Sequence, residues 1–311
     1  MAHTLYLIAK TTRPRQWIKN LALFAPIIFS GKLLSFTDLI TIIIAFILFC
    51  GLASAMYIIN DVLDAPRDRL HPFKKKRPIA AGDLPVPLAL TIAFSLILIL
   101  LPLSYQLSVG FFAIASAYLL LQLAYSFILK HIILIDVMSI AAGFILRVYA
   151  GVWAINAHMN VWFLLCVVAL SLFLAVGKRR SELTLLTGEK AGAHRGTLSH
   201  YPEMLLHSLT TMFATATWIS YGMFAFLQPP VASKLLYTAF LEETIPPPPE
   251  RKWLMLTTPL VIYGVMRYLY LIYEKREGES PERVLLSDKP LFATVVLWTL
   301  LTIGIIYVLG A

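Results

Sequence analysis

The chain has 311 residues, of which 59% are hydrophobic and 14% charged, and its formal net charge is +9. So apolar a composition excludes a soluble globular domain and predicts an integral membrane protein surrounded by membrane lipids. The positive charge reflects membrane topology rather than nucleic-acid binding, because Lys and Arg gather beside the ends of apolar segments. Cys50 and Cys166 fall inside such segments, at a spacing that predicts neither a metal site nor a disulfide framework.

Nine segments have the length and apolar character of transmembrane helices. A hydrocarbon core of about 30 Å is crossed by about 20 helical residues, and backbone groups in lipid must find their partners within the segment. The segments are 17–30, 39–59, 86–104, 107–129, 132–155, 161–177, 207–228, 254–273 and 290–310. We therefore expect an all-α integral membrane protein, with nine transmembrane helices around a central cavity. It would form a single domain over residues 1–311, without a cleavable signal peptide.

The distribution of basic residues predicts the orientation. With a cytoplasmic N-terminus, 20 of the 26 Lys and Arg lie in cytoplasmic segments and only four in the opposite loops. Cytoplasmic loops normally carry this excess, so we expect a multi-pass protein of the cell membrane whose active site faces the cytoplasm. Lipid-facing and partner-facing helix surfaces have similar compositions, which leaves a homo-oligomer open.

A basic pair precedes the first predicted helix. Arg15 and Lys19 are four residues apart and share a helix face, and Asn20 enters the membrane just beyond them. Contact with a polar substrate is one interpretation of the three residues. A hydrogen bond from Asn20 to a neighbouring helix explains the pattern equally well.

The most informative motif follows the second predicted helix. Asn60, Asp61, Asp64 and Asp68 fall within about a 100° arc of a helix, so their side chains can converge on one point. Carboxylates gathered in this way repel each other unless a cation lies among them. Mg²⁺ prefers such oxygen ligands and shares its coordination shell with substrate phosphates. The motif therefore predicts a catalytic Mg²⁺–diphosphate site at the mouth of a membrane protein.

Two further groups of polar residues follow. The cationic run from Lys74 to Arg77 lies close enough to the motif to hold the rest of a polyanion. Tyr125, Lys130 and Asp136 surround a very short connection between the fourth and fifth helices. Asp136 has apolar neighbours in the sequence, so its carboxylate needs a partner. Lys130 is the nearest cation, but the two residues do not share a helix face, so they could pair only across the turn between the helices. The alternative is an interfacial role for both residues, with Lys130 snorkelling.

Arg147 is the most deeply placed cation. It lies about 15 residues into its predicted helix, or about 22 Å from the cytoplasmic end. A central Arg costs about 2.5–3.5 kcal/mol on insertion scales, which makes a functional role the default hypothesis. Snorkelling toward the outer interface is the competing interpretation.

The sixth predicted helix is followed by Lys178, Arg179 and Glu182. Lys178 and Glu182 are four residues apart and share a helix face. An ordinary positive-inside loop start with one ion pair would explain them. They occupy the place in the other half of the bundle that corresponds to the aspartate motif. This position favours the interpretation that they form the second half of the same site.

Together these blocks resemble the UbiA superfamily of intramembrane prenyltransferases. The resemblance rests on the nine helices, on Asn60-Asp61-x-x-Asp64-x-x-x-Asp68, and on Arg77-Pro78-Ile79-Ala80-Ala81-Gly82. Within the superfamily the chain is most similar to the decaprenyl-phosphate phosphoribosyltransferase branch. The blocks that suggest the branch are residues 13–20, His71-Pro72 with Lys74 and Arg77, Gly143-Phe144-x-Leu146-Arg147, and Gly177-Lys178-Arg179-x-x-Glu182.

The resemblance implies transfer of 5-phosphoribose from phosphoribosyl pyrophosphate to a polyprenyl phosphate of the decaprenyl type. Pyrophosphate would be released, Mg²⁺ would be the cofactor, and the product would serve cell-wall biosynthesis. The site residues that it implies are Asn60, Asp61, Asp64 and Asp68 for Mg²⁺, Lys74 and Arg77 for the diphosphate, Lys178 and Arg179 for the 5-phosphate, Glu182 for a ribose hydroxyl or for Lys178, and Tyr125, Lys130 and Asp136 for the cavity wall.

One departure from the superfamily pattern is informative. Typical members carry a second Asp-x-x-x-Asp motif after the sixth helix, where this chain has Lys178-x-x-x-Glu182. A lysine removes a metal ligand and adds an anion-binding cation, which suits a donor with an additional phosphate. The alternative is a UbiA-type transferase that moves a prenyl group from its diphosphate to an aromatic or other acceptor. A transporter is disfavoured, because its ion site would be expected near the midplane.

Overall fold

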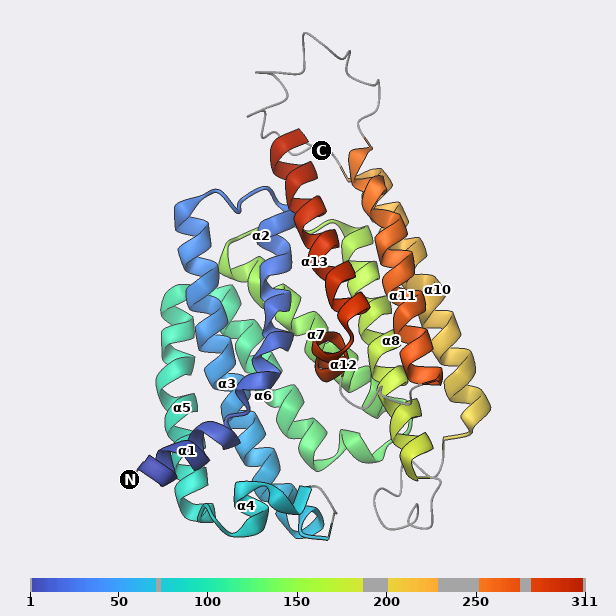
Figure 1. Ribbon diagram of the computed structural model, residues 1–311. Coiled ribbons are helices and arrows are strands. Elements are labelled where there is room, and N and C mark those ends of the chain that lie inside the picture. The colour runs from blue at the N-terminus through green and yellow to red at the C-terminus, as the bar shows by residue number, and fades with distance from the viewer. Residues whose placement is uncertain (1, 71–73, 187–200, 229–251, 275–280, 310–311) are drawn as a thin grey trace.

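The computed structural model describes residues 2–70, 74–186, 201–228, 252–274 and 281–309, and within these ranges all regular structure is helical (Figure 1). The long helices are α3 (Phe36–Asp68), α5 (Val86–Leu107), α6 (Val109–Phe127), α7 (Ile135–Ala154), α8 (Val161–Leu186), α10 (Glu203–Leu227), α11 (Thr258–Tyr273) and α13 (Lys289–Gly304). The short elements are α1 (Ala2–Thr11), α2 (Ala25–Phe29), α4 (Pro78–Ala81), α12 (Pro281–Ser287), the 3₁₀ helices η1 (Pro14–Phe24), η2 (Lys74–Lys76), η3 (Leu129–His131) and η6 (Trp253–Thr257), and the π-helical η7 (Ile305–Leu309).

Seven helices in the described part of the chain are long and apolar enough to cross a membrane, so the prediction of nine is not confirmed. The first predicted segment, 17–30, is instead the 3₁₀ helix η1 followed by the five residues of α2. The 25-residue α10 is long enough, but its many Ser and Thr residues lower its hydropathy. Several of these hydroxyls donate to the carbonyl four residues back, as Thr210 and Ser220 do at 2.6 Å, so the helix accommodates them without outside partners.

The aspartate motif lies on a helix that continues past the membrane. Helix α3 begins after Ser35, whose hydroxyl accepts a hydrogen bond from the Asp38 backbone N–H at 3.4 Å, and runs for 33 residues. Its length is about 50 Å, against a hydrocarbon core of about 30 Å. The last turns, from Asn60 to Asp68, therefore lie beyond the apolar stretch. The 26-residue α8 carries Lys178 and Glu182 beyond its predicted end in the same way.

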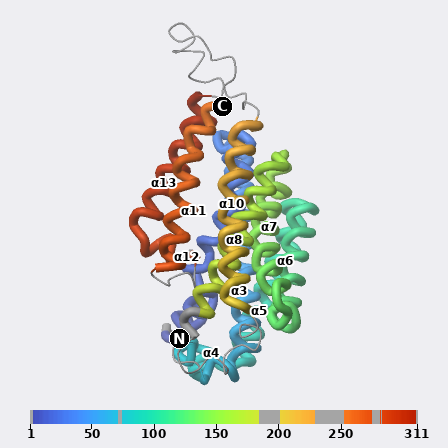
Figure 2. The backbone as a smooth tube through the Cα atoms, turned by 90° about the vertical axis from the view of Figure 1, so that its right-hand side faces the viewer, coloured from blue at the N-terminus to red at the C-terminus, as the bar shows by residue number. Residues whose placement is uncertain are grey.

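Consecutive long helices pack side by side, from α3 through α13 (Figures 1 and 2). The segment made of η1 and α2 runs between the two halves of the bundle and contacts both α3 and α7. Helices α1 and α4 lie together at one end, next to the last turns of α3 (Figure 1). This end of the bundle, which we call the charged end, carries the aspartate motif.

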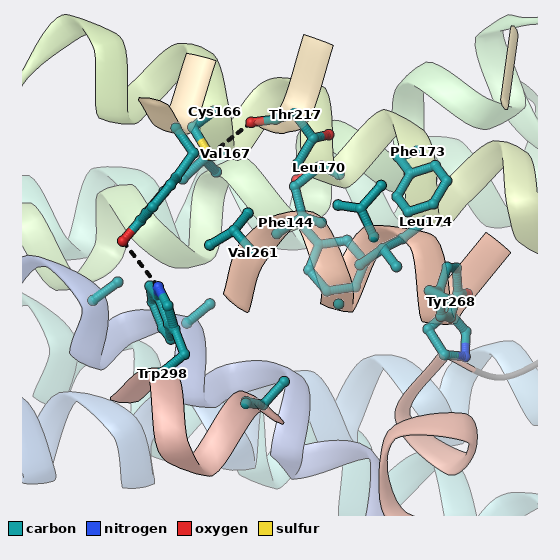
Figure 3. A pocket seen from close by; sticks show the side chains of 18 of the residues that line it. Phe144, Cys166, Val167, Leu170, Phe173, Leu174, Thr217, Val261, Tyr268 and Trp298 are labelled. Carbon is teal, nitrogen blue, oxygen red and sulfur yellow. Dashed lines mark hydrogen bonds between the residues drawn. The ribbon is translucent and has the colours of Figure 1, made fainter. Parts of the chain in front are cut away.

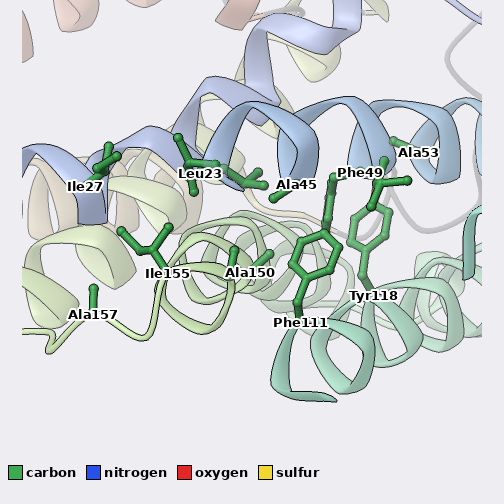
Figure 4. Packing of buried hydrophobic residues seen from close by; sticks show 13 residues of the cluster. Leu23, Ile27, Ala45, Phe49, Ala53, Phe111, Tyr118, Ala150, Ile155 and Ala157 are labelled. Carbon is green, nitrogen blue, oxygen red and sulfur yellow. The ribbon is translucent and has the colours of Figure 1, made fainter. Parts of the chain in front are cut away.

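A small residue allows η1 to reach the centre of the bundle. A Cβ atom at Gly151 of α7 would lie 2.1 Å from the carbonyl oxygen of Leu23, so only glycine permits this approach. Leu23 is fully buried there, in a cluster with Phe49 and Tyr118, whose ring centroids are 4.7 Å apart (Figure 4). Burial of large apolar and aromatic side chains in this cluster joins η1, α3, α6 and α7.

Candidate active site

Two arginines meet the outer carboxylates of the aspartate motif. Arg77 Nη1 lies 3.1 Å from Asp61 Oδ1 and also forms an ion pair with Asp68. Arg13 forms a second ion pair with Asp61, which is only 3% exposed. Arg13 lies between α1 and η1 with φ 53°, a left-handed conformation that is uncommon for residues other than glycine and is found at functional sites. Arg13 was not among the predicted site residues, although it lies directly before Pro14 in the block that carries Arg15.

The inner part of the motif faces the connection between α6 and α7. Lys130 Nζ lies 2.8 Å from Asp64 Oδ1, and Asn60 Nδ2 donates to Asp64 Oδ2 at 3.0 Å. Ser126 Oγ donates to Asn60 Oδ1 at 3.1 Å. Lys130 is 6% exposed, so it does not snorkel. It forms an ion pair with Asp64 of another helix, whereas Asp136, the nearest carboxylate in sequence, has a different cationic partner.

Asp136 has a different cationic partner, Arg179 of α8. Arg179 Nε lies 2.6 Å from Asp136 Oδ2, and Arg179 Nη2 donates to the Tyr125 hydroxyl at 2.9 Å. Arg179 also forms an ion pair with Glu182 and is 1% exposed. Lys178 is less enclosed: its side chain is 32% exposed, and its Nζ lies 3.9 Å from Glu182 Oε1, as the four-residue spacing predicted. The structure thus brings these five predicted residues together between α6, α7 and α8.

Tyr201 is a member of this group that sequence analysis missed. Its hydroxyl donates to Asp136 Oδ1 at 2.6 Å and accepts from the Leu134 N–H at 2.6 Å. Leu134 has φ 66°, so this hydrogen bond supports a strained residue at the start of α7. Burial and the hydrogen bond to Asp136 raise the pKa of Tyr201, which keeps the phenol protonated as a donor. No local pattern marks Tyr201, since its partners are more than 60 residues away in sequence.

The residue types fit Mg²⁺, but their arrangement differs from the prediction. Within the described ranges no three Asp, Glu, His or Cys side chains are close enough to share a metal. Asp61 and Asp68 share Arg77, whereas Asp64 pairs with Asn60 and Lys130. The predicted convergence of all four side chains is therefore not observed, because cations that the linear pattern did not include neutralise the carboxylates separately. Mg²⁺ commonly needs only one or two carboxylates together with substrate phosphates, so the donor set still suits it.

The deeper predicted residues have mainly structural contacts. Arg147 is 4% exposed and donates from Nε to Asn20 Oδ1 at 2.8 Å, so it does not snorkel outward. The interpretation of Asn20 as a helix–helix hydrogen-bonding residue is confirmed. Arg15 is exposed on η1, and Lys19 lines a cavity described next. His71 and Pro72 lie outside the described residues.

An apolar cavity of about 450 Å³ occupies the other half of the bundle (Figure 3). Its wall is formed by η1, α2, α7, α8, α10, α11, α12 and α13, with side chains such as Phe144, Leu170 and Val261 pointing into it. The few polar groups in the wall include Ser171 and Thr217, and Lys19 is its cationic residue. A cavity of this size and lining suits an apolar chain.

Charged helix ends and an apolar cavity within a bundle of membrane-spanning helices suit an intramembrane enzyme that acts on a phosphorylated lipid. Comparison with known proteins identifies the family. The model of the UbiA prenyltransferase family matches residues 22–285, and the chain belongs to this family.

Similar proteins support the same placement. The chain is 35% identical over 296 residues to the decaprenyl-phosphate phosphoribosyltransferase of Mycolicibacterium smegmatis, covering 94% of this chain and 89% of that one. It is 34% identical over 305 residues to the enzyme of the same name from Corynebacterium glutamicum, covering 96% and 86%. Among solved structures, a UbiA homologue from Archaeoglobus fulgidus bound to GPP and Mg²⁺ has the same fold. The TM-score is 0.70 at 19% identity, and the match covers 96% of this chain and 99% of that one.

Proposed function

We propose that the protein transfers 5-phosphoribose from phosphoribosyl pyrophosphate to a polyprenyl phosphate and releases pyrophosphate. The observation that carries the proposal is the composition of the second half of the site, where a partly exposed Lys178 precedes Glu182 on α8. A cation at this place suits a donor with an additional phosphate. Relatives with the corresponding name, at 34–35% identity over nearly the whole chain, support the same donor and acceptor.

The two substrates would occupy different parts of the bundle. The prenyl chain suits the apolar cavity, where Lys19 on η1 is placed to attract the lipid phosphate. The polar donor suits the charged end, where Asp61, Asp64 and Asp68 lie among cations. The Lys and Arg distribution along the chain favours a cytoplasmic position for this end, on the side where phosphorylated sugars are found.

Mg²⁺ would be held by one or two carboxylates of the aspartate motif, from among Asp61, Asp64 and Asp68, together with donor phosphate oxygens, and when bound it would neutralise charge on the donor diphosphate. Arg77 ion-pairs with two of these carboxylates and is 26% exposed, so it can also contact a diphosphate oxygen. Lys130, held at 2.8 Å from Asp64, keeps that carboxylate oriented. The positive charges of Arg77 and Lys130 favour departure of the anionic leaving group.

The reaction would form a bond from an acceptor phosphate oxygen to the anomeric carbon of ribose, while the bond from that carbon to the diphosphate breaks. Glycosyl transfer of this kind passes through an oxocarbenium-like state. The acceptor phosphate is already an anion near neutral pH, so no strong general base is needed. Arg179 would act through its neighbours, since its contacts with Asp136, Glu182 and Tyr125 join α8 to α6 and α7.

The proposal is tested by transfer of label from phosphoribosyl pyrophosphate into the lipid phase. Purified protein in detergent should transfer radiolabelled phosphoribose to a polyprenyl phosphate, and EDTA should stop the transfer. Absence of transfer, together with activity on a prenyl diphosphate and an aromatic acceptor, would contradict the proposal and favour prenyl transfer. The assay with a prenyl diphosphate is included as a control because the structure of the Archaeoglobus fulgidus homologue contains GPP and Mg²⁺.

A further inference from the structure

Helix α1 runs across the long helices at the charged end, and its two faces differ (Figure 1). Leu7 and Thr11 are buried against the bundle, at 6% and 1% exposed. On the opposite face Leu5 and Tyr6 are 62% and 63% exposed, and Ala9 is exposed as well. These last three residues, which we call the apolar stripe of α1, fall within about 100° of the helix circumference. No described part of the chain covers the stripe.

One hydrogen bond shows how deep the end of α1 lies. The backbone carbonyl of Thr12, directly after α1, accepts from Ser54 Oγ of α3 at 3.1 Å. Ser54 lies about 9 Å before Asn60 along α3. It therefore belongs to the apolar stretch of that helix and not to the turns that carry the aspartate motif. The end of α1 is thus level with residues that cross the membrane.

The packing of Ile8 gives the same depth. This side chain packs against a buried cluster that includes Met56 of α3 and Ala89 of α5. Ala89 is in the first turn of α5, a 22-residue helix that is long and apolar enough to span a membrane. Because α1 packs sideways on α3 and α5, its apolar stripe points away from the bundle at this level. In a membrane that α5 crosses, such a surface faces lipid.

We propose that the apolar stripe of α1 binds phospholipids of the leaflet at the charged end, which makes α1 an in-plane membrane helix. Leu5 contacts acyl chains, and Tyr6 has the apolar ring and polar hydroxyl that suit the boundary between hydrocarbon and headgroups. A helix of ten residues is too short to be stable in water by itself. Protein contacts on one face and lipid contacts on the other stabilise it together.

This lipid contact is linked to the aspartate motif through the chain. Arg13, which forms the ion pair with Asp61, lies between α1 and η1. Lipid that holds α1 in place therefore restricts the positions open to Arg13. Lys10 lines a cavity of about 280 Å³ with Arg13 and Lys74, so it belongs to the charged site already described and is not counted in the stripe.

The test measures the depth of spin labels in nanodiscs of phosphatidylcholine and phosphatidylglycerol. Leu5→Cys and Tyr6→Cys place a nitroxide on the stripe, one at a time. The native Cys50 and Cys166 are buried, so the reagent should select the introduced thiol, and wild-type protein treated in the same way is the control for that selectivity. Collision of the label with oxygen, which enters the bilayer, is compared with collision with a water-soluble nickel chelate.

Two reference labels set the scale. Leu98→Cys reports the lipid interior, because Leu98 is 76% exposed in the middle of α5. Lys75→Cys reports water, because Lys75 is exposed on η2 in the cationic run. We expect the labels at Leu5 and Tyr6 to lie about 5–10 Å into the boundary between headgroups and acyl chains. They should be shallower than the label at Leu98 and protected from the chelate, unlike the label at Lys75.

Two outcomes would overturn the inference. Access of the chelate to the stripe equal to that at Lys75 would place this face in water. Protection of both stripe labels from oxygen and chelate alike would show that protein covers the face. In that second case, dipolar broadening between labels would identify the cover as another copy of the chain, and its absence would indicate a different protein.

Discussion

Arg147 of α7 donates from Nε to Oδ1 of Asn20 in η1, at 2.8 Å, in the interior of the bundle. Its other donors reach the Gly143 carbonyl at 2.6 Å and the Tyr118 hydroxyl at 2.9 Å, and its guanidinium carbon lies 4.9 Å from the Tyr118 ring centroid. The buried charge is thus satisfied by neutral acceptors and aromatic rings. This contact ties the short η1, which begins after Arg13 and carries Lys19, to a long membrane helix.

Asn20→Leu should destabilise the protein by about 1–3 kcal/mol, because the buried Arg147 Nε–H would lose its acceptor. The free energy of unfolding in mixed micelles is the measurement. As a control, the double variant with Arg147→Met should be less destabilised than the sum of the two single variants, since the residues are in direct contact. Additive losses would contradict the coupling.

Gly151→Ala should destabilise the protein by about 1–3 kcal/mol through overpacking. The added Cβ would lie 2.1 Å from the Leu23 carbonyl oxygen, a backbone atom that moves only if η1 shifts. Gly222→Ala in α10 is a matched control, because nothing lies within 4 Å of a Cβ at that position. Its melting temperature should equal or slightly exceed that of the wild type, since alanine favours helix. Equal melting temperatures for the two variants would argue against the close packing of η1 on α7.

Asp136→Ala should cost about 3–5 kcal/mol, because it removes one of the two carboxylates that neutralise the buried Arg179. The loss is measured as a fall in the midpoint of denaturant unfolding at constant protein-to-detergent ratio. Asp136→Asn keeps the shape of the side chain and tests the charge alone. A wild-type midpoint for Asp136→Ala would show that the ion pair does not support the fold.

Tyr201→Phe should destabilise the start of α7 by about 1–3 kcal/mol. The variant removes the donor to Asp136 and the acceptor of the Leu134 N–H, both at 2.6 Å. Hydrogen exchange of the Leu134 amide should become faster than in the wild type, while exchange in α3 stays unchanged. Unaltered exchange at Leu134 would contradict the role given to the phenol.

Asp64→Asn should lower phosphoribosyl transfer by about 100-fold or more while the protein still folds, with a lower melting temperature because the buried Lys130 loses its charged partner. The amide keeps the size of the side chain but removes the charge that faces Lys130 and that Mg²⁺ would need. Transfer rates at several Mg²⁺ concentrations, together with a melting curve, check the prediction. Wild-type rates from folded Asp64→Asn protein would remove Asp64 from the proposed metal site.

Much of the architecture could be predicted from local patterns. Apolar runs of about 20 residues located the helices, and helical spacing placed Lys178 beside Glu182 at 3.9 Å. The same reasoning failed where partners are far apart in sequence. Lys130 pairs with Asp64 on α3 rather than with the nearby Asp136, which is held by Arg179 on α8. Tyr201 was missed because it belongs to no recognisable local pattern, and Arg13 because its partner Asp61 lies 48 residues away on α3.

The sequence by itself determined the membrane-embedded helical class, the positions of the long helices and the residue types of the charged end, because hydropathy and helical periodicity act over a few turns. Only the tertiary structure decided which cation neutralises which carboxylate, that η1 reaches the centre of the bundle as a 3₁₀ helix, and that Arg13 joins Lys74 in one pocket wall. These relationships depend on the packing of separate helices. Coulombic and hydrogen-bond energies fall steeply with distance, so packing that brings two side chains within about 3 Å selects their partners.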